Sequence, residues 1–145
     1  MSGRAIVVKT NSAEETRAVG AALARALPPG SCVSLEGPLG AGKTEFVRGF
    51  CAGLDVADVV TSPTYTLSNE YETGRGHRVL HVDAFRLAGS GELLDLDLDH
   101  RRDPKGYLLV EWGERAADAL PPDRARVTLA TDPAEEGVRR IAFEL

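Results

Sequence analysis

The first part of the chain alternates between the apolar spacing of strands and that of helices. Arg4–Lys9 and Ser31–Glu36 are short apolar runs bounded by polar or turn residues, which predicts a strand for each. Between them, Ser12-Ala-Glu-Glu15 has the pattern of a capping box that begins a helix. Apolar residues at helical spacing follow, and a Pro-Pro-Gly turn ends the helix: Val19, Leu23 and Leu27. A second helix is predicted over Thr44–Gly53, with its phenylalanines on one side.

The middle of the chain changes to a strand pattern. Tyr65–Glu72 and Arg78–Val82 predict two strands, and the Thr73-Gly-Arg-Gly76 turn between them predicts a hairpin. Gly91–Asp99 is acidic with regularly spaced leucines, which indicates a short helix or a helical turn. Tyr107–Glu111 is a continuous apolar run ending in an acid, as expected for a strand that is buried on both faces.

The last third predicts a short helix followed by two strands. The helix covers Gly113–Leu120 and is closed by two prolines. Arg124–Ala130 and Arg139–Leu145 are expected to pair antiparallel. No internal repeat, low-complexity tract or linker interrupts the pattern, so residues 1–145 are expected to form a single α/β domain.

Composition indicates the cellular compartment in which the protein is expected to work. An apolar share of 43% and a charged share of 27% are typical of a water-soluble globular protein. No apolar run approaches the roughly 20 residues that cross a bilayer, and Ala5–Val8 is too short for a signal-peptide core. We therefore expect a cytoplasmic protein without a membrane partner, in which Cys32 and Cys51 are reduced and buried.

The net charge limits how the protein can bind nucleic acids. A formal charge of −5 argues against a protein that grips a nucleic-acid backbone, since that requires many lysines and arginines on one face. DNA is therefore not an expected partner, and any role in RNA chemistry is expected to be indirect.

A glycine-rich segment carries the strongest chemical signal. Residues Gly37-Pro-Leu-Gly-Ala-Gly-Lys-Thr44 match the pattern G-x-x-x-x-G-K-[ST] between an apolar strand and a helix. Glycines let backbone N–H groups turn inward around phosphates, and the following helix presents its positive end to them. Lys43 supplies a cation for the β- and γ-phosphates, and the Thr44 hydroxyl a ligand for Mg²⁺. The motif predicts a P-loop that binds a nucleotide.

A P-loop site also needs an acid at the end of a neighbouring strand. Asp83 and Glu111 both follow apolar strands, and either could hold Mg²⁺ while the other orients water; each could also be only a strand-end cap. His81 alternates with Asp83 and is as compatible with a packed histidine as with a catalytic one. Thr61–Tyr65 lies where many P-loop enzymes sense the γ-phosphate, although an ordinary turn explains it equally well. Trp112 could belong to the core or pack against the catalytic loop.

The motifs GPLGAGKT, TSPTYTL, HVDAFRL and LLVEWGERA, in this order, resemble the TsaE (YjeE) family of small bacterial P-loop ATPases. The resemblance extends from about Ser12 to Leu120. It implies a three-layer P-loop NTPase-like domain, with a central mixed and mostly parallel sheet and an antiparallel C-terminal strand pair. It also implies a subunit of the machinery that forms N6-threonylcarbamoyladenosine at position 37 of tRNAs reading ANN codons. TsaD and TsaB type proteins would be its partners.

The resemblance also implies roles for single residues. Those expected to bind ATP or ADP are Leu39, Gly40, Ala41, Gly42, Lys43 and Thr44, with Ala13 near the adenine and Arg139 approaching from the last hairpin. Thr44 and Glu111 would be the Mg²⁺ ligands, Asp83 with Lys43 would be catalytic, and Thr64 would lie in a switch-like loop. Phe85 and Gly113 depart from the family pattern, which more often has tyrosine and proline there.

Other functions remain compatible with a P-loop. A small kinase acting on a nucleoside or metabolite would need an arginine-bearing lid, for which Arg101-Arg102 is the candidate. A GTPase is disfavoured, because the chain has no Asn-Lys-x-Asp element to recognise guanine. A module whose nucleotide only locks an interface is a third class. The intact set of Lys43, Thr44, Asp83 and Glu111 favours turnover, weak in the isolated chain.

Overall fold

The computed structural model describes residues 5–38, 40–62, 68–85 and 98–145. Leu39, Thr64, residues 91–97 of the expected acidic helix and residues 65–67 of the expected hairpin lie outside this part. The elements are, in chain order, β1 (Ala5–Thr10), α1 (Ala13–Ala26), β2 (Cys32–Glu36), α2 (Lys43–Gly53), β3 (Ser68–Glu72), β4 (Arg78–Asp83), α4 (Leu98–Arg101), β5 (Tyr107–Glu111), the 3₁₀ helix η1 (Gly113–Ala119), β6 (Ala125–Thr131) and β7 (Arg139–Glu144). Ser12 caps α1 as its sequence predicts, accepting a hydrogen bond from the Glu15 N–H at 3.1 Å.

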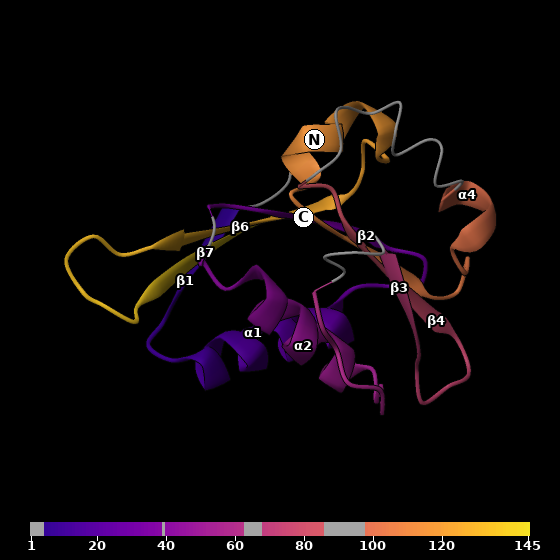
Figure 1. Ribbon diagram of the computed structural model, residues 1–145, viewed down its shortest axis with the longest axis horizontal. Helices are drawn as coiled ribbons and strands as arrows, with labels where there is room; N and C mark the ends of the chain where they lie inside the picture. The colour runs from indigo at the N-terminus through magenta and orange to yellow at the C-terminus, as the bar shows by residue number, and fades with distance from the viewer. Residues whose placement is uncertain (1–4, 39, 63–67, 86–97) are drawn as a thin grey trace.

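The seven strands in the described residues form one sheet, in the order β1-β7-β6-β2-β5-β4-β3 (Figure 1). Its centre, β6-β2-β5-β4, is parallel, and antiparallel strands extend it at both edges. The predicted hairpin (β3 with β4) and the predicted C-terminal pair (β6 with β7) are both present. Because the carboxyl ends of parallel strands meet at one edge of a sheet, the segments after β2, β4 and β5 lie close together.

Helices cover both faces of the sheet, as expected for three layers. α1 and α2 lie on one face and η1 lies on the other (Figure 1). Alternate residues of β5 serve the two faces: Tyr107 and Leu109 belong to the core under α1 and α2, whereas Leu108 and Val110 belong to the core under η1. Every residue of β5 is buried, which explains why this strand is continuously apolar in the sequence.

Glycines allow α1 and α2 to approach each other closely. A Cβ on Gly49 of α2 would lie 1.9 Å from the Arg17 carbonyl oxygen of α1, and one on Gly20 of α1 would lie 2.3 Å from the Phe46 carbonyl oxygen. Both distances are far below van der Waals contact, and both neighbours are backbone atoms. The two helices therefore meet backbone to backbone, which fixes the start of α2 relative to α1.

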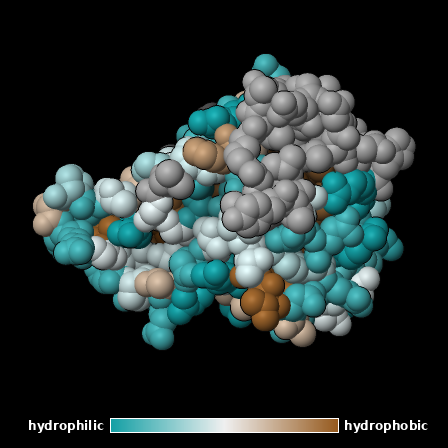
Figure 2. Space-filling view, in the orientation of Figure 1, coloured by the Kyte–Doolittle hydropathy of each residue, from teal (hydrophilic) through white to brown (hydrophobic). Residues whose placement is uncertain are grey.

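The surface of the described part is mostly polar. Its exposed large apolar side chains are Ile6, Val7, Val59 and Leu145, and on the face seen in Figure 2 hydrophobic areas are small and separate. In the described ranges no helix has the length and apolar character needed to span a bilayer.

Both cysteines are buried and free, as predicted. Burial raises the pKa of the Cys32 thiol to about 11 and that of Cys51 to about 12, so both remain protonated at neutral pH.

We expect Gly49→Ala to destabilise the fold, although alanine favours helix over glycine by roughly 0.5–1 kcal/mol. The added methyl group would meet the Arg17 carbonyl, and overpacking of this kind costs about 1–3 kcal/mol. Gly137→Ala is the control, because its Cβ would meet nothing within 4 Å and only its φ of +81° is unfavourable. Urea unfolding measures both variants, and a more stable Gly49→Ala protein would contradict the close helix approach.

Candidate functional site

The glycine-rich loop connects the end of β2 to the start of α2, as its motif predicts. Gly37, Gly40 and Gly42 have φ values of +136°, +78° and +100°, a region that residues with a side chain rarely adopt. A Cβ at Gly37 would also lie 2.1 Å from the Leu129 carbonyl oxygen of β6. These glycines let the loop turn tightly around the N-terminus of α2, the geometry that binds phosphate groups.

A cavity of about 560 Å³ opens beside this loop. Its lining comes from the loop, the start of α2, the chain after α2, the ends of β4 and β5 with the residues that follow them, and β7: Gly40, Ala41, Gly42, Lys43, Thr44, Glu45, Ser62, Asp83, Phe85, Glu111, Trp112 and Arg139. The fold thus brings together the predicted loop residues that are described, both candidate acids and Arg139. Arg139 also donates a hydrogen bond to the Gly40 carbonyl at 3.0 Å.

Ala13 is not among the lining residues. It begins α1, and Thr16 in the same helix turn lies near the loop, since its Cγ2 would be 3.7 Å from a Cβ on Gly42. The adenine contact expected at Ala13 stays a prediction.

Lys43 lies at the centre of the cavity wall and is only 6% exposed. Its ammonium donates to the carbonyl oxygens of Gly37 and Pro38, the latter at 3.0 Å. It also lies 3.7 Å from the centre of the Trp112 ring, a cation–π contact. Trp112 therefore packs against Lys43 of the glycine-rich loop and also against the core under η1, so both placements that its sequence position allowed are present.

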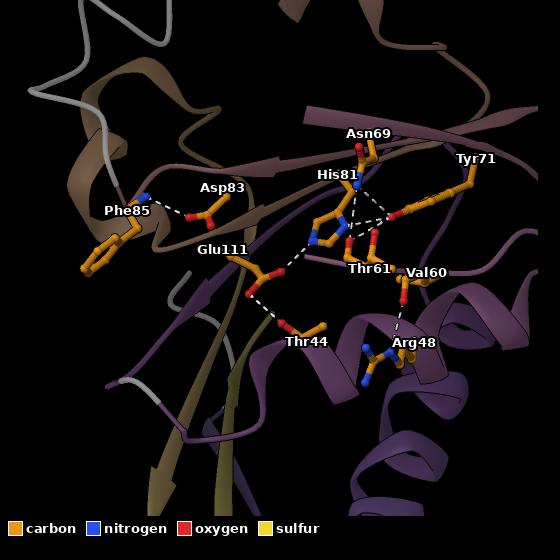
Figure 3. Close-up of polar contacts among 10 residues, drawn as sticks. All are labelled: Thr44, Arg48, Val60, Thr61, Asn69, Tyr71, His81, Asp83, Phe85 and Glu111. Carbon is orange, nitrogen blue, oxygen red and sulfur yellow. Dashed lines mark hydrogen bonds and ion pairs between the residues drawn. The ribbon is translucent and has the colours of Figure 1, made fainter. Parts of the chain in front are cut away.

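The two candidate acids are register partners at the ends of adjacent parallel strands, Asp83 on β4 and Glu111 on β5. The Thr44 hydroxyl donates to Glu111 Oε1 at 3.2 Å. Asp83 Oδ1 accepts the Phe85 N–H at 2.9 Å, so it also shapes the turn that leaves β4 (Figure 3). The acids differ in burial, since Glu111 is 3% exposed and Asp83 is half-buried.

The donor set suits a hard cation. Hydroxyl and carboxylate oxygens are the ligands Mg²⁺ takes, and at a P-loop it uses one or two protein ligands with phosphate oxygens and water. Thr44 and Glu111 provide such a pair. Across the described ranges no group of three or more His, Cys, Asp or Glu side chains is placed to hold a metal.

Burial and the neighbouring carboxylates have opposite effects on the pKa of Lys43. Burial lowers the pKa of the Lys43 ammonium below the ordinary lysine value, while the negative charges of Glu111, Glu114 and Asp83, in that order, raise it. The acids thus favour the charged form of a lysine that its surroundings partly dehydrate.

His81 is buried and hydrogen-bonded, as a packed histidine would be. Its side chain is 0% exposed, and its Nε2 lies 2.5 Å from Glu111 Oε2 (Figure 3). It does not line the cavity. His81 therefore lies behind the acid and contacts it from the side opposite to Thr44.

A charge cluster at the start of α2 was not predicted from the sequence. The Glu45 carboxylate pairs with Arg17 of α1 and with Arg48, one turn further along α2. Although burial raises it, hydrogen bonds from Arg17 and Arg48 hold the pKa of Glu45 below its usual value. The Glu45–Arg48 spacing of three residues was a detectable signal; the Arg17 contact depends on how the helices pack.

The arginines considered for a kinase lid point elsewhere. Arg101 donates to Ser68 Oγ and Glu70 of β3. Arg102 donates to the Gly30 carbonyl at 2.6 Å and lines a different cavity, near the start of β2. Neither arginine is among the residues that line the P-loop cavity.

Comparison with known proteins identifies the family. The family model described as "Threonylcarbamoyl adenosine biosynthesis protein TsaE" matches residues 10–141. The chain belongs to the TsaE family. A TsaE protein from Bacillus subtilis is 37% identical over 135 residues, covering 93% of this chain and 82% of the relative. For Treponema pallidum the identity is 38% over 132 residues, with 91% and 95% covered.

A TsaE protein from Streptomyces coelicolor is 43% identical over 115 residues, covering 78% of this chain and 77% of the relative. All three relatives are named as tRNA threonylcarbamoyladenosine biosynthesis proteins. The crystal structure of Bacillus subtilis YdiB superposes with a TM-score of 0.80 at 31% identity, covering 99% of this chain and 86% of YdiB. The TsaE sequence pattern and the P-loop NTPase-like fold therefore agree.

We expect Glu111→Gln to lower the pKa of Lys43 further, because it removes the negative charge that most favours the ammonium form. Lysine-selective NMR suits this measurement, since Lys9, Lys43 and Lys105 are the lysines of the chain. Glu136→Gln, an exposed acid in the turn between β6 and β7, should leave the titration midpoint unchanged. An upward shift in Glu111→Gln would show that the Lys43 ammonium does not interact with this carboxylate.

Proposed function

We propose that this chain is the ATP-binding and ATP-hydrolysing subunit of the machinery that forms N6-threonylcarbamoyladenosine at position 37 of tRNAs reading ANN codons. The observation that carries the proposal is the contact of Thr44 with Glu111 beside Lys43 of a P-loop, in a member of the TsaE family. This arrangement suits phosphate groups and Mg²⁺, and the names of the relatives support the pathway.

Binding would use the loop and its cation. Backbone N–H groups of residues 40–44 and the N-terminus of α2 face the phosphates. The Lys43 ammonium, which now contacts the Gly37 and Pro38 carbonyls, exchanges them for phosphate oxygens that carry full charge. Arg139, which donates a hydrogen bond to the Gly40 carbonyl, adds positive charge beside the loop.

Thr44 and Glu111 would hold Mg²⁺ through their oxygens. When bound, this ion neutralises charge on the phosphate oxygens. The carboxylate of Glu111 is already aimed by its two hydrogen bonds, from Thr44 and His81, so little reorientation is needed. Preorganised ligands of this kind improve both affinity and geometry.

Asp83 would position the attacking water. It lines the cavity and is the register partner of Glu111, so the two carboxylates occupy neighbouring places at the sheet edge. A carboxylate there can accept a proton from water that attacks the terminal phosphate. Its hydrogen bond to the Phe85 N–H holds the carboxylate in place.

The partners proposed are TsaD and TsaB type proteins, with tRNA reached only through them, in the cytoplasm. Ser62 and Asp83 both line the cavity, and each lies at or near the start of a segment that we expect to respond to the γ-phosphate. These segments, residues 61–65 and 83–87, continue beyond the described ranges. A small acidic domain with such segments suits a motor that changes the state of a partner.

A small kinase is the weaker candidate. It would need a cationic lid over a second substrate, and the candidate arginines are engaged with β3 and with Gly30. Transfer of label from ATP to a panel of nucleosides, rather than to water, would favour the kinase.

Three substitutions separate the proposed roles. Lys43→Ala should weaken ATP binding by about 1.5–3 kcal/mol, the typical value of a hydrogen bond to a charged group. Asp83→Asn should keep nucleotide affinity but slow hydrolysis roughly 10²-fold or more, and Glu111→Gln should raise the Mg²⁺ concentration required. Calorimetry and phosphate release measure these effects, with Glu136→Gln as the control. Unchanged ATP affinity in a folded Lys43→Ala protein would refute the site, and normal hydrolysis by Asp83→Asn would leave that residue a strand-end cap.

The partner prediction is tested with purified proteins. The isolated chain should hydrolyse ATP slowly, bind a TsaD–TsaB pair from the same organism in a nucleotide-dependent way, and hydrolyse faster in the complex. Size-exclusion chromatography and phosphate release with ATP, ADP or no nucleotide measure this. The absence of a complex in all three conditions would contradict the tRNA-modification role while leaving nucleotide binding intact.

A further inference from the structure

A continuous series of polar contacts leads from the P-loop threonine to the chain after α2 (Figure 3). Glu111 Oε1 accepts the Thr44 hydroxyl at 3.2 Å, and Glu111 Oε2 lies 2.5 Å from His81 Nε2. His81 Nδ1 lies 3.3 Å from the Tyr71 hydroxyl, which in turn contacts the Thr61 carbonyl oxygen at 3.1 Å. We call Glu111, His81, Tyr71 and the Thr61 carbonyl the relay.

We propose that the relay couples the backbone at Thr61–Ser62 to the orientation of the Glu111 carboxylate, and that His81 and Tyr71 are positioning residues for the magnesium site. The inference rests on the proposed function, because it assigns Glu111 to Mg²⁺. It adds a link from that ligand to the segment after α2, whose Ser62 lines the same cavity.

His81 determines which carboxylate oxygen is available. A carboxylate only accepts hydrogen bonds, so Nε2 of His81 carries the hydrogen that joins it to Glu111 Oε2. The carboxylate is thereby held with Oε1 toward Thr44. A hydrogen-bonded carboxylate beside a metal loses fewer orientations when it binds, and such outer partners commonly determine metal affinity.

Tyr71 connects the ring of His81 to the segment after α2. Its hydroxyl contacts both His81 Nδ1 and the Thr61 carbonyl. The Asn69 amide donates to the same carbonyl at 3.2 Å, and Arg48 Nε donates to the preceding carbonyl, Val60, at 3.0 Å. Three side chains from β3 and α2 thus anchor two successive peptide units, and the next residue, Ser62, lines the cavity.

The inner part of the relay is buried, which strengthens its polar contacts. His81 is 0% exposed, Glu111 3% and Tyr71 5%. Buried polar groups that lose a partner have no water to replace it. Burial also raises the pKa of Tyr71, so the phenol keeps its single proton, which it donates to the Thr61 carbonyl oxygen, while the same hydroxyl oxygen lies 3.3 Å from His81 Nδ1. A shift of the Thr61 carbonyl would leave the Tyr71 hydroxyl to reorganise, and His81 with it.

Coupling between two sites is reciprocal. If the backbone at Thr61–Ser62 biases the Glu111 carboxylate, then a metal ligand position imposed on Glu111 biases that backbone equally. The relay would therefore report the filling of the magnesium site to the expected switch-like segment. Conversely, a partner that holds this segment would change metal and nucleotide affinity.

The decisive variant is Tyr71→Phe, which removes the hydroxyl and keeps the ring. Tyr107→Phe is a matched control: Tyr107 is 6% exposed, and its hydroxyl donates to a backbone carbonyl, Leu27, at 3.0 Å, but it does not touch the relay. We measure nucleotide binding by calorimetry at increasing Mg²⁺. Tyr71→Phe should raise the Mg²⁺ midpoint several-fold, whereas Tyr107→Phe should not, and nucleotide affinity without Mg²⁺ should stay the same in both.

Substitutions of His81 test the direction of the link. His81→Leu should raise the Mg²⁺ midpoint about tenfold, as is usual when the partner of a metal ligand is lost. His81→Gln, whose amide can still donate to Glu111, should recover most of that loss but should no longer respond to Tyr71→Phe. If His81→Leu does not fold, the comparison of Tyr71→Phe with Tyr107→Phe decides the question alone.

The outcomes separate the relay from the function on which it rests. If the wild-type chain binds no nucleotide, or binds it without any effect of Mg²⁺, the proposed function itself is wrong. If Mg²⁺ matters and Glu111→Gln shifts its midpoint, but Tyr71→Phe behaves like Tyr107→Phe, then the relay is overturned and the magnesium site stands.

Discussion

The hydrogen bond between Thr44 and Glu111 joins the beginning of α2 to the end of β5, and most of the site depends on it. It holds only if α2 begins at the correct height above the sheet. That height depends on the backbone contact of α2 with α1 at Gly49 and Gly20, and on the tight turn at Gly37 against β6. Gly20 and Gly49, which are not among the residues that line the cavity, therefore contribute to its geometry together with Gly37 of the loop.

The same region concentrates charge in places where water is scarce. Lys43 is nearly buried, and Glu111 lies between Thr44 and His81 with 3% of its surface exposed. Buried charges are costly unless they are paired and hydrogen-bonded. Here each one has partners in the protein: carbonyl oxygens and an aromatic ring for Lys43, donors for Glu111. Incoming phosphates and Mg²⁺ would meet groups that are already aimed.

The positions of Asp83 and Glu111 follow from ordinary sheet geometry. Parallel strands in register place their last residues side by side. The sequence shows that both strands end in an acid, but it does not show that the strands are neighbours, since the chain between them has more than twenty residues. In the same way, a small residue at Gly113 is explained only by the fold, because a Cβ there would lie 1.8 Å from Ser34 Oγ.

The sequence by itself determined the local features of this protein. Period and turn residues predicted the strands and the helices α1, α2 and η1, and the motif at Gly37–Thr44 predicted the glycine-rich turn between β2 and α2, because both depend on residues close together in the chain. Tertiary structure decided the contacts between distant segments. Tyr71 looks like any aromatic residue of a hairpin strand, and His81 like any packed histidine, until β4 pairs with β5 and brings them behind Glu111. The physical reason is that hydrogen-bond partners are chosen by strand order and register, which no single segment encodes.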